Sequence, residues 1–171
     1  MELTRQQLLD FLNESSFLND IGATYSVAEY QEDAELVGAI EKDGMKYVII
    51  LDNDENIQHL SMAVEEIFPG VDEELLKMAG DEASNKLWAG FGGRIMTTEN
   101  SAHFCISFPT QMTGDLDFTL RYSMMNIDLA IKVLDESLSA LEQEYGDEPD
   151  DEPEEIEEKV FPGRGRAAML S

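Results

Sequence analysis

The chain has 171 residues, which is the size of one domain, and its charge is strongly one-sided. Lys and Arg together number 11 and Asp and Glu number 37, so the net charge is −26. This balance argues against nucleic acids and anionic membranes as main partners, because both require a basic protein surface. A basic protein, a cation or solubility alone remains as the reason for the acidity.

The sequence favours a soluble, cytoplasmic protein. Its single cysteine, Cys105, allows no intramolecular disulfide, which fits a reducing compartment. Residues 1–7 lack the basic and apolar regions of a signal peptide. No apolar run approaches the roughly 18 residues of a membrane-spanning helix, so no transmembrane segment is expected.

The first expected element is a helix over residues 4–20, where leucine and phenylalanine recur at helical spacing. Thr4 fits the N-cap of this helix, and Gly22 fits its end. Short polar turns then separate four predicted strands, over residues 24–30, 35–41, 45–51 and 57–64. Short turns between short strands predict antiparallel hairpins.

A second helix is predicted over residues 72–88, with Asp72 as its N-cap. Gly80 is expected to kink or split this helix, because glycine costs about 1 kcal/mol relative to alanine in a helix. A second hairpin follows, with strands over residues 91–98 and 102–109. In its second strand, apolar and polar residues alternate, which predicts one buried face.

The longest expected element is a C-terminal helix over residues 116–145, in which apolar residues recur at a mean spacing of about 3.6. The order α-β-β-β-β-α-β-β-α predicts an α+β fold, with helices packed on an antiparallel sheet. Residues 1–145 are expected to form one domain. Residues 146–171 form an acidic and then basic tail, which is expected to be disordered because its acidic part has few apolar residues.

Methionines outside the helical pattern are the first candidates for a partner-binding surface. Met112 and Met125 are out of step with the apolar positions, and methionine packs against varied partners. Met78 and Met124 are in step with those positions and are expected in the core. The basic, apolar end of the tail supplies three further candidates, either as a docking peptide or as part of a solubilising linker: Phe161, Arg164 and Arg166.

No catalytic or metal-binding motif is found. Asp52, Asp54 and Asn56 resemble the start of a calcium loop, but the glycine and the acid that this loop requires later are absent. A hairpin turn is therefore favoured there. Three other candidate metal ligands lack a fourth partner: His59, His103 and Cys105. No catalytic residue, metal ligand or cofactor is assigned.

Several elements together carry a family resemblance: the leading helix, the strand pair around Lys42–Val48, the helix ending Ala83–Leu87, the hairpin Arg94–Pro109 and the long last helix. With these in order, residues 4–145 resemble the YbjN family, named for a proposed role as bacterial sensory transduction regulators. The layout is also similar to that of the class I chaperones of type III secretion. The resemblance implies a small acidic bacterial protein that binds another polypeptide, and in the chaperones it implies a dimer. It implies no catalytic residues.

The sequence therefore predicts a non-enzymatic protein-binding module, chaperone-like or regulatory, that acts on another polypeptide. We expect a homodimer in the bacterial cytoplasm, with a partner that is itself basic. A regulator that responds to a small ligand or a cation through clustered carboxylates is the alternative.

Overall fold

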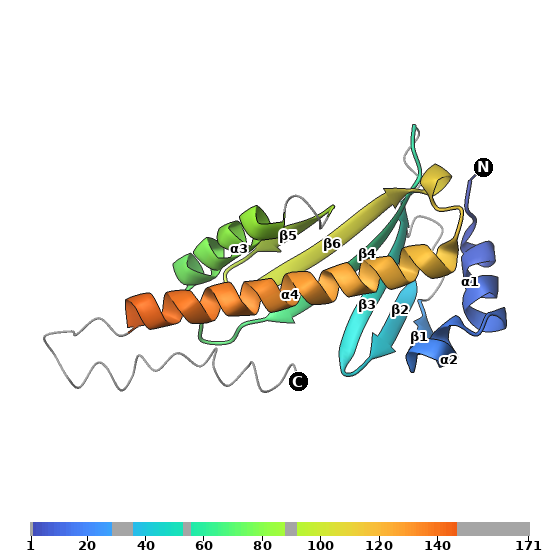
Figure 1. Ribbon diagram of the computed structural model, residues 1–171. Helices are drawn as coiled ribbons and strands as arrows, with labels where there is room; N and C mark the ends of the chain where they lie inside the picture. Colours follow the sequence, from blue (N-terminus) through green and yellow to red (C-terminus); the bar gives the residue numbers. More distant parts are fainter. Residues whose placement is uncertain (1, 29–35, 53–55, 88–91, 147–171) are drawn as a thin grey trace, which may run out of the picture. The chain divides into compact units, whose positions relative to one another are not determined.

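Figure 1 shows a computed structural model of the chain, which describes residues 2–28, 36–52, 56–87 and 92–146. In chain order its elements are α1 (Arg5–Glu14), α2 (Phe17–Ile21), β1 (Thr24–Val27), β2 (Leu36–Lys42), β3 (Met45–Asp52), β4 (His59–Ile67), α3 (Glu73–Leu87), β5 (Gly93–Thr97), β6 (Ser101–Pro109), η1 (Thr110–Met112) and α4 (Leu116–Gly146). The strands form one antiparallel sheet in the order β1-β2-β3-β4-β6-β5, which confirms the predicted α+β fold. The tail from residue 147 onward lies outside the described residues.

The chain divides into two compact units. The first unit consists of Met1–Val64 and Cys105–Ile127, and the second of Glu65–Phe104 and Asp128–Ser171. Alternate residues of β3 and of β4 are buried in the first unit, as a half-covered strand requires. In the second unit, α3 and the later part of α4 each bury one apolar face. The prediction of one domain over residues 1–145 stays a prediction.

The single helix predicted over residues 4–20 is two helices, α1 and α2. Thr4 caps α1 in a capping box with Gln7, as expected. The backbone at Ser15 adopts an extended conformation, and the Ser15 Oγ accepts a hydrogen bond from the Phe17 amide at 3.4 Å. Serine side chains compete with helical backbone bonds in this way, which explains the break. Gly22 ends α2 in the left-handed conformation, with a φ of 68°.

The prediction that Gly80 kinks or splits the second helix is wrong, because α3 runs unbroken from Glu73 to Leu87. Asp72 caps it, accepting hydrogen bonds from the amides of Glu74 and Leu75. Gly80 is buried, and a Cβ there would lie 2.7 Å from the Cγ2 methyl of Thr97 on β5. The glycine therefore allows α3 and β5 to approach closely.

Gly80→Ala is expected to lower the free energy of unfolding by about 1 kcal/mol. Alanine gains about 1 kcal/mol in helix propensity, but forcing a methyl group against Thr97 costs about 1–3 kcal/mol. Thr97→Ser removes the opposing methyl group, so Gly80→Ala should be neutral or stabilising in that background. Urea denaturation of the two single variants and the double variant measures this. If Gly80→Ala raised the free energy of unfolding equally in both backgrounds, the contact with Thr97 would not be what disfavours alanine at position 80.

The long helix predicted over residues 116–145 is confirmed as α4. Its buried side chains follow the predicted period: Leu120, Met124, Ile127, Ile131, Leu134, Leu138 and Leu141. Leu116 and Tyr145, at the two ends of the pattern, are not buried. In β6, Ala102, Phe104 and Ile106 are buried as the alternation predicts, whereas Phe108, the next residue on this face, is only half-buried.

Candidate functional site

The face of α4 opposite its buried residues carries large apolar side chains in the first unit. Phe118 is 64% exposed and Met125 is 63% exposed, with Tyr122 half-buried between them. At 3.6 residues per turn, these three residues lie within an arc of about 60°. We call them the α4 apolar surface. The solvent-facing side of a helix normally carries polar residues, so this surface requires an explanation.

Aromatic contacts hold the α4 apolar surface in place. The rings of Phe118 and Tyr122, one helical turn apart, stack with their centroids 5.8 Å apart. The ring of Phe108 on β6 meets Tyr122 edge-on at 5.9 Å. Such ring pairs contribute about 0.5–1.5 kcal/mol each beyond the area that they bury. The rings of Phe118 and Tyr122 are therefore fixed before any partner arrives, which lowers the entropic cost of binding.

The start of α4 is fixed by Asp115. Its Oδ1 accepts a hydrogen bond from the Phe118 amide at 3.1 Å, and its carbonyl oxygen accepts one from the Thr119 hydroxyl at 2.8 Å. These contacts satisfy free backbone groups of the first turn, and the carboxylate lies favourably at the positive end of the helix dipole. The cap therefore orients the turn that carries Phe118.

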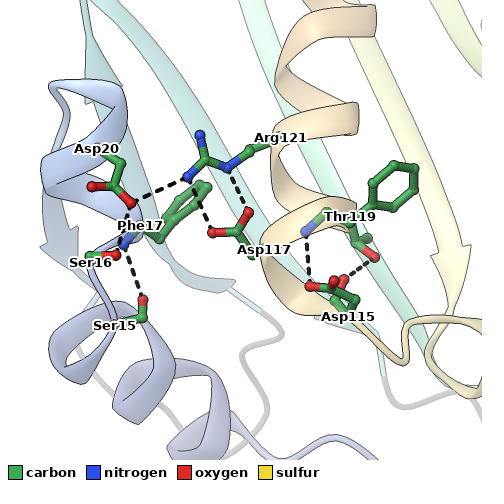
Figure 2. A network of polar contacts seen from close by, with 9 residues as sticks. Ser15, Ser16, Phe17, Asp20, Asp115, Asp117, Thr119 and Arg121 are labelled. Atoms are coloured by element: carbon green, nitrogen blue, oxygen red, sulfur yellow. Dashed lines mark hydrogen bonds and ion pairs between the residues drawn. The ribbon is translucent and has the colours of Figure 1, made fainter.

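An ion-pair network joins α4 to α2 beside this surface. Figure 2 shows the Arg121 guanidinium between two carboxylates, with Nε 2.6 Å from Asp117 and Nη2 3.6 Å from Asp20. The guanidinium carbon also lies 5.4 Å from the centre of the buried Phe17 ring. The hydrogen bond to Asp117 raises the pKa of Arg121 above its usual value. The network has more negative than positive groups.

Met112 lies on the short η1 turn before α4 and is 76% exposed. The turn is anchored by Thr110, whose amide donates to the Gln58 carbonyl oxygen at 2.9 Å and whose hydroxyl donates to Gln58 Oε1 at 2.8 Å. Gln58 also donates to the Leu3 carbonyl oxygen at 2.8 Å. An open hollow of about 460 Å³ lies beside the turn, lined by Glu2, Leu3, Gln7, Thr110, Gln111, Thr113, Gly114 and Leu116.

The structure places the sequence candidates as follows. Met112 and Met125 are on the surface and Met124 is buried, as predicted. The prediction that Met78 lies in the core is wrong, because it is 41% exposed. The buried arc of α3 is centred on Leu76 and Ala83, and Met78 lies outside it. The three tail candidates lie outside the described residues: Phe161, Arg164 and Arg166.

Sequence reasoning missed Phe118 and Tyr122 as surface residues. The signal was present, because Phe118, Tyr122 and Met125 follow one another at spacings of four and three residues. The apolar pattern on the buried face of the same helix is stronger, and it masks this second pattern.

The side chains weighed as metal ligands have ordinary polar neighbours. His103 Nε2 lies 3.3 Å from the Ser101 hydroxyl and 3.8 Å from Glu65. Cys105 Sγ lies 3.9 Å from the Ser107 hydroxyl. Within the described ranges, no group of three or more His, Cys, Asp or Glu side chains is placed to hold a metal ion. Over the same ranges, none of the helices combines the length and the apolar character that crossing a membrane demands.

No protein-family model and no curated protein matches this chain. It is similar to a crystal structure of YbjN from E. coli, described as a proposed transcription regulator. The two share 13% sequence identity over 80% of this chain and 93% of YbjN, with a TM-score of 0.46. This likeness concerns the fold alone and transfers no functional residue.

Proposed function

We propose that this protein is a non-enzymatic, chaperone-like or regulatory module that binds another polypeptide through the α4 apolar surface. The observation that carries the proposal is the exposure of Phe118 and Met125 on a helix face that would otherwise be polar. Aromatic residues and methionine are enriched where proteins bind one another, because they bury large areas with adaptable packing.

The charge around the surface indicates the chemistry of the partner. Asp20, Asp115 and Asp117 lie beside it against one cation, Arg121, and the whole chain has a net charge of −26. A segment with apolar residues flanked by Lys or Arg would match both features. The acidic rim would raise the rate of encounter, and the apolar contacts would set the lifetime of the complex.

Met125→Glu is expected to abolish capture of this partner. It places a carboxylate within the apolar contact, and leaving such a charge unpaired in an interface costs several kcal/mol. The measurement is capture from native lysate by the immobilised full-length chain, read by mass spectrometry at low and high salt. A protein retained by the wild type in high salt, and lost with Met125→Glu, would support the proposal.

Met78→Glu is the matched control. It makes the same chemical change at another exposed helical methionine and should leave capture unchanged.

A second variant tests the tail, with Phe161, Arg164 and Arg166 all changed to alanine. If capture survives Met125→Glu but is lost with the tail variant, the binding site is in the tail and the proposed surface is wrong.

A further inference from the structure

The hollow beside the η1 turn has the size of a ligand site, and the proposed function does not use it. Its volume of about 460 Å³ falls within the usual range for ligand pockets, about 300–1,000 Å³. The N-terminal segment contributes Leu3 and Gln7 to its walls, and the turn into α4 contributes Gln111 and Leu116. These residues all belong to the first compact unit. We call this cavity the η1 hollow.

Hydrogen bonds through one side chain, that of Gln58, hold the walls of the η1 hollow together. Gln58 accepts a hydrogen bond from the Leu3 amide and donates one to the Leu3 carbonyl oxygen, both at 2.8 Å. Its Oε1 also accepts a hydrogen bond from the Thr110 hydroxyl at 2.8 Å. The Thr113 hydroxyl in turn donates to the Thr110 carbonyl oxygen at 2.8 Å. Walls that are fixed in advance lower the entropic cost of binding a ligand.

The side chains that line the η1 hollow fit a cation on an apolar stem. Among the described lining residues Glu2 is the one that carries a charge, and Gln7 and Gln111 carry amides. Carboxylate and amide oxygens accept hydrogen bonds, and an arginine guanidinium offers five N–H donors in one plane. Leu3 and Leu116 provide apolar surface for the methylene groups of such a side chain. An anion is disfavoured, since none of the described lining residues is basic.

The η1 hollow is close to the α4 apolar surface. Leu116 lines the hollow, and Phe118, two residues later on α4, belongs to the surface. Two residues of α-helix turn through about 200°, so these side chains lie on opposite sides of a helix about 10–12 Å across. An extended peptide covers at most about 3.3–3.6 Å per residue, so about three to five residues lead from one to the other.

We propose that the η1 hollow binds the guanidinium of an arginine that the polypeptide partner supplies, about three to five residues from the apolar residue that covers Phe118. The Glu2 carboxylate pairs with the guanidinium, and the Gln111 amide oxygen accepts a further hydrogen bond. Leu3 and Leu116 contact the methylene groups. Binding of a guanidinium follows from the hollow alone, whereas the assignment of the arginine to the partner rests on the proposed function.

NMR titration of the full chain with N-acetyl-L-arginine amide tests the site. The backbone amide signals of Leu3, Thr113 and Gly114 should shift and saturate, with a Kd in the millimolar range that is usual for so small a ligand. N-acetyl-L-citrulline amide has nearly the same shape without the charge, and it should bind about threefold to tenfold more weakly. Signals that do not move, or equal binding of the two ligands, would overturn the proposal.

Glu2→Gln identifies the group that recognises the charge. It should weaken binding of the arginine derivative by the same factor and leave the citrulline derivative unchanged, so that the variant no longer distinguishes the two ligands. Glu14→Gln is the matched control, because it removes an exposed carboxylate at the far end of α1 and should behave as the wild type. If both variants weakened arginine binding alike, the overall charge and not the hollow would attract the ligand, contrary to the proposal.

Partner capture distinguishes this inference from the proposed function. Glu2→Gln should reduce the amount of partner retained, whereas Met125→Glu should abolish its retention. A hollow that selects arginine, in a protein whose capture survives Met125→Glu, supports the site and contradicts the proposed function. Capture that is lost with Met125→Glu, without arginine selectivity in the hollow, does the reverse. Arginine selectivity with capture that Glu2→Gln leaves unchanged would overturn the assignment of the arginine to the partner.

Discussion

Gly38→Ala should lower the free energy of unfolding by about 3 kcal/mol, although it adds only one methyl group to a strand. A Cβ at this position would collide with the backbone oxygen of Ser26 and with the hydroxyl of Tyr25, both on the neighbouring strand β1. A backbone atom held in a sheet cannot rotate away. Relief would therefore require β1 and β2 to separate, at the upper end of the usual cost of overpacking, about 1–3 kcal/mol.

The surroundings of Gly38 are already closely packed. The Tyr25 hydroxyl donates a hydrogen bond to the Val37 carbonyl oxygen at 3.2 Å, and burial raises the pKa of Tyr25 above its usual value. The pairing of β2 with β3 also shifts register between Leu36 and Gly38. Glycine is common at such irregular positions, where a neighbouring backbone approaches closely.

Gly114→Ala is the matched control for Gly38→Ala. No atom lies within 4 Å of a Cβ at Gly114, so its free energy of unfolding should change by less than about 0.5 kcal/mol. Urea denaturation of both variants, followed by circular dichroism, measures the difference. Equal effects at the two positions would mean that β1 moves away from β2 at little cost.

The sequence predicts those elements that depend on local patterns. The apolar period of α4, the alternation in β6 and the capping side chains Thr4 and Asp72 all act within a few residues of their targets. Burial of one face of an element leaves a periodic pattern in the sequence, and a capping residue is indicated by its type at the start of a helix.

The two errors in the helices have different causes. Gly80 looks like a weak point in a helix, but Thr97 on another element lies against it and leaves no room for a side chain. Such a close approach depends on packing that periodicity does not encode. The break at Ser15 has a local cause, because its side chain accepts a hydrogen bond from the Phe17 amide, and the apolar period does not reveal this polar contact.

Of the three residues of the α4 apolar surface, the sequence predicts one, Met125, as exposed. The surface positions of Met112 and Met125 follow from their departure from the core pattern. The network in which Arg121 meets Asp20 could not be predicted, because the two residues are about one hundred positions apart in the chain. No periodic signal links α2 to the start of α4.

Phe17→Ala should lower the free energy of unfolding by about 4 kcal/mol, the usual cost of removing a fully buried ring. Phe17 has no exposed surface, and its ring centre lies 5.8 Å from that of Phe11 on α1. Its loss would also remove the surface over which the Arg121 guanidinium lies. Because α2 has five residues and one buried side chain, this helix depends on the ring for its position. Urea denaturation measures the loss.

Phe118→Ala, the same substitution on α4, should change the free energy of unfolding by less than about 1 kcal/mol. Its ring is largely exposed and loses mainly the stacking contact with Tyr122. Partner capture should instead weaken, since this ring is part of the surface proposed to bind the partner. If Phe118→Ala destabilised the monomer as much as Phe17→Ala does, the Phe118 ring would be buried in solution. The α4 apolar surface would then not be available to a partner.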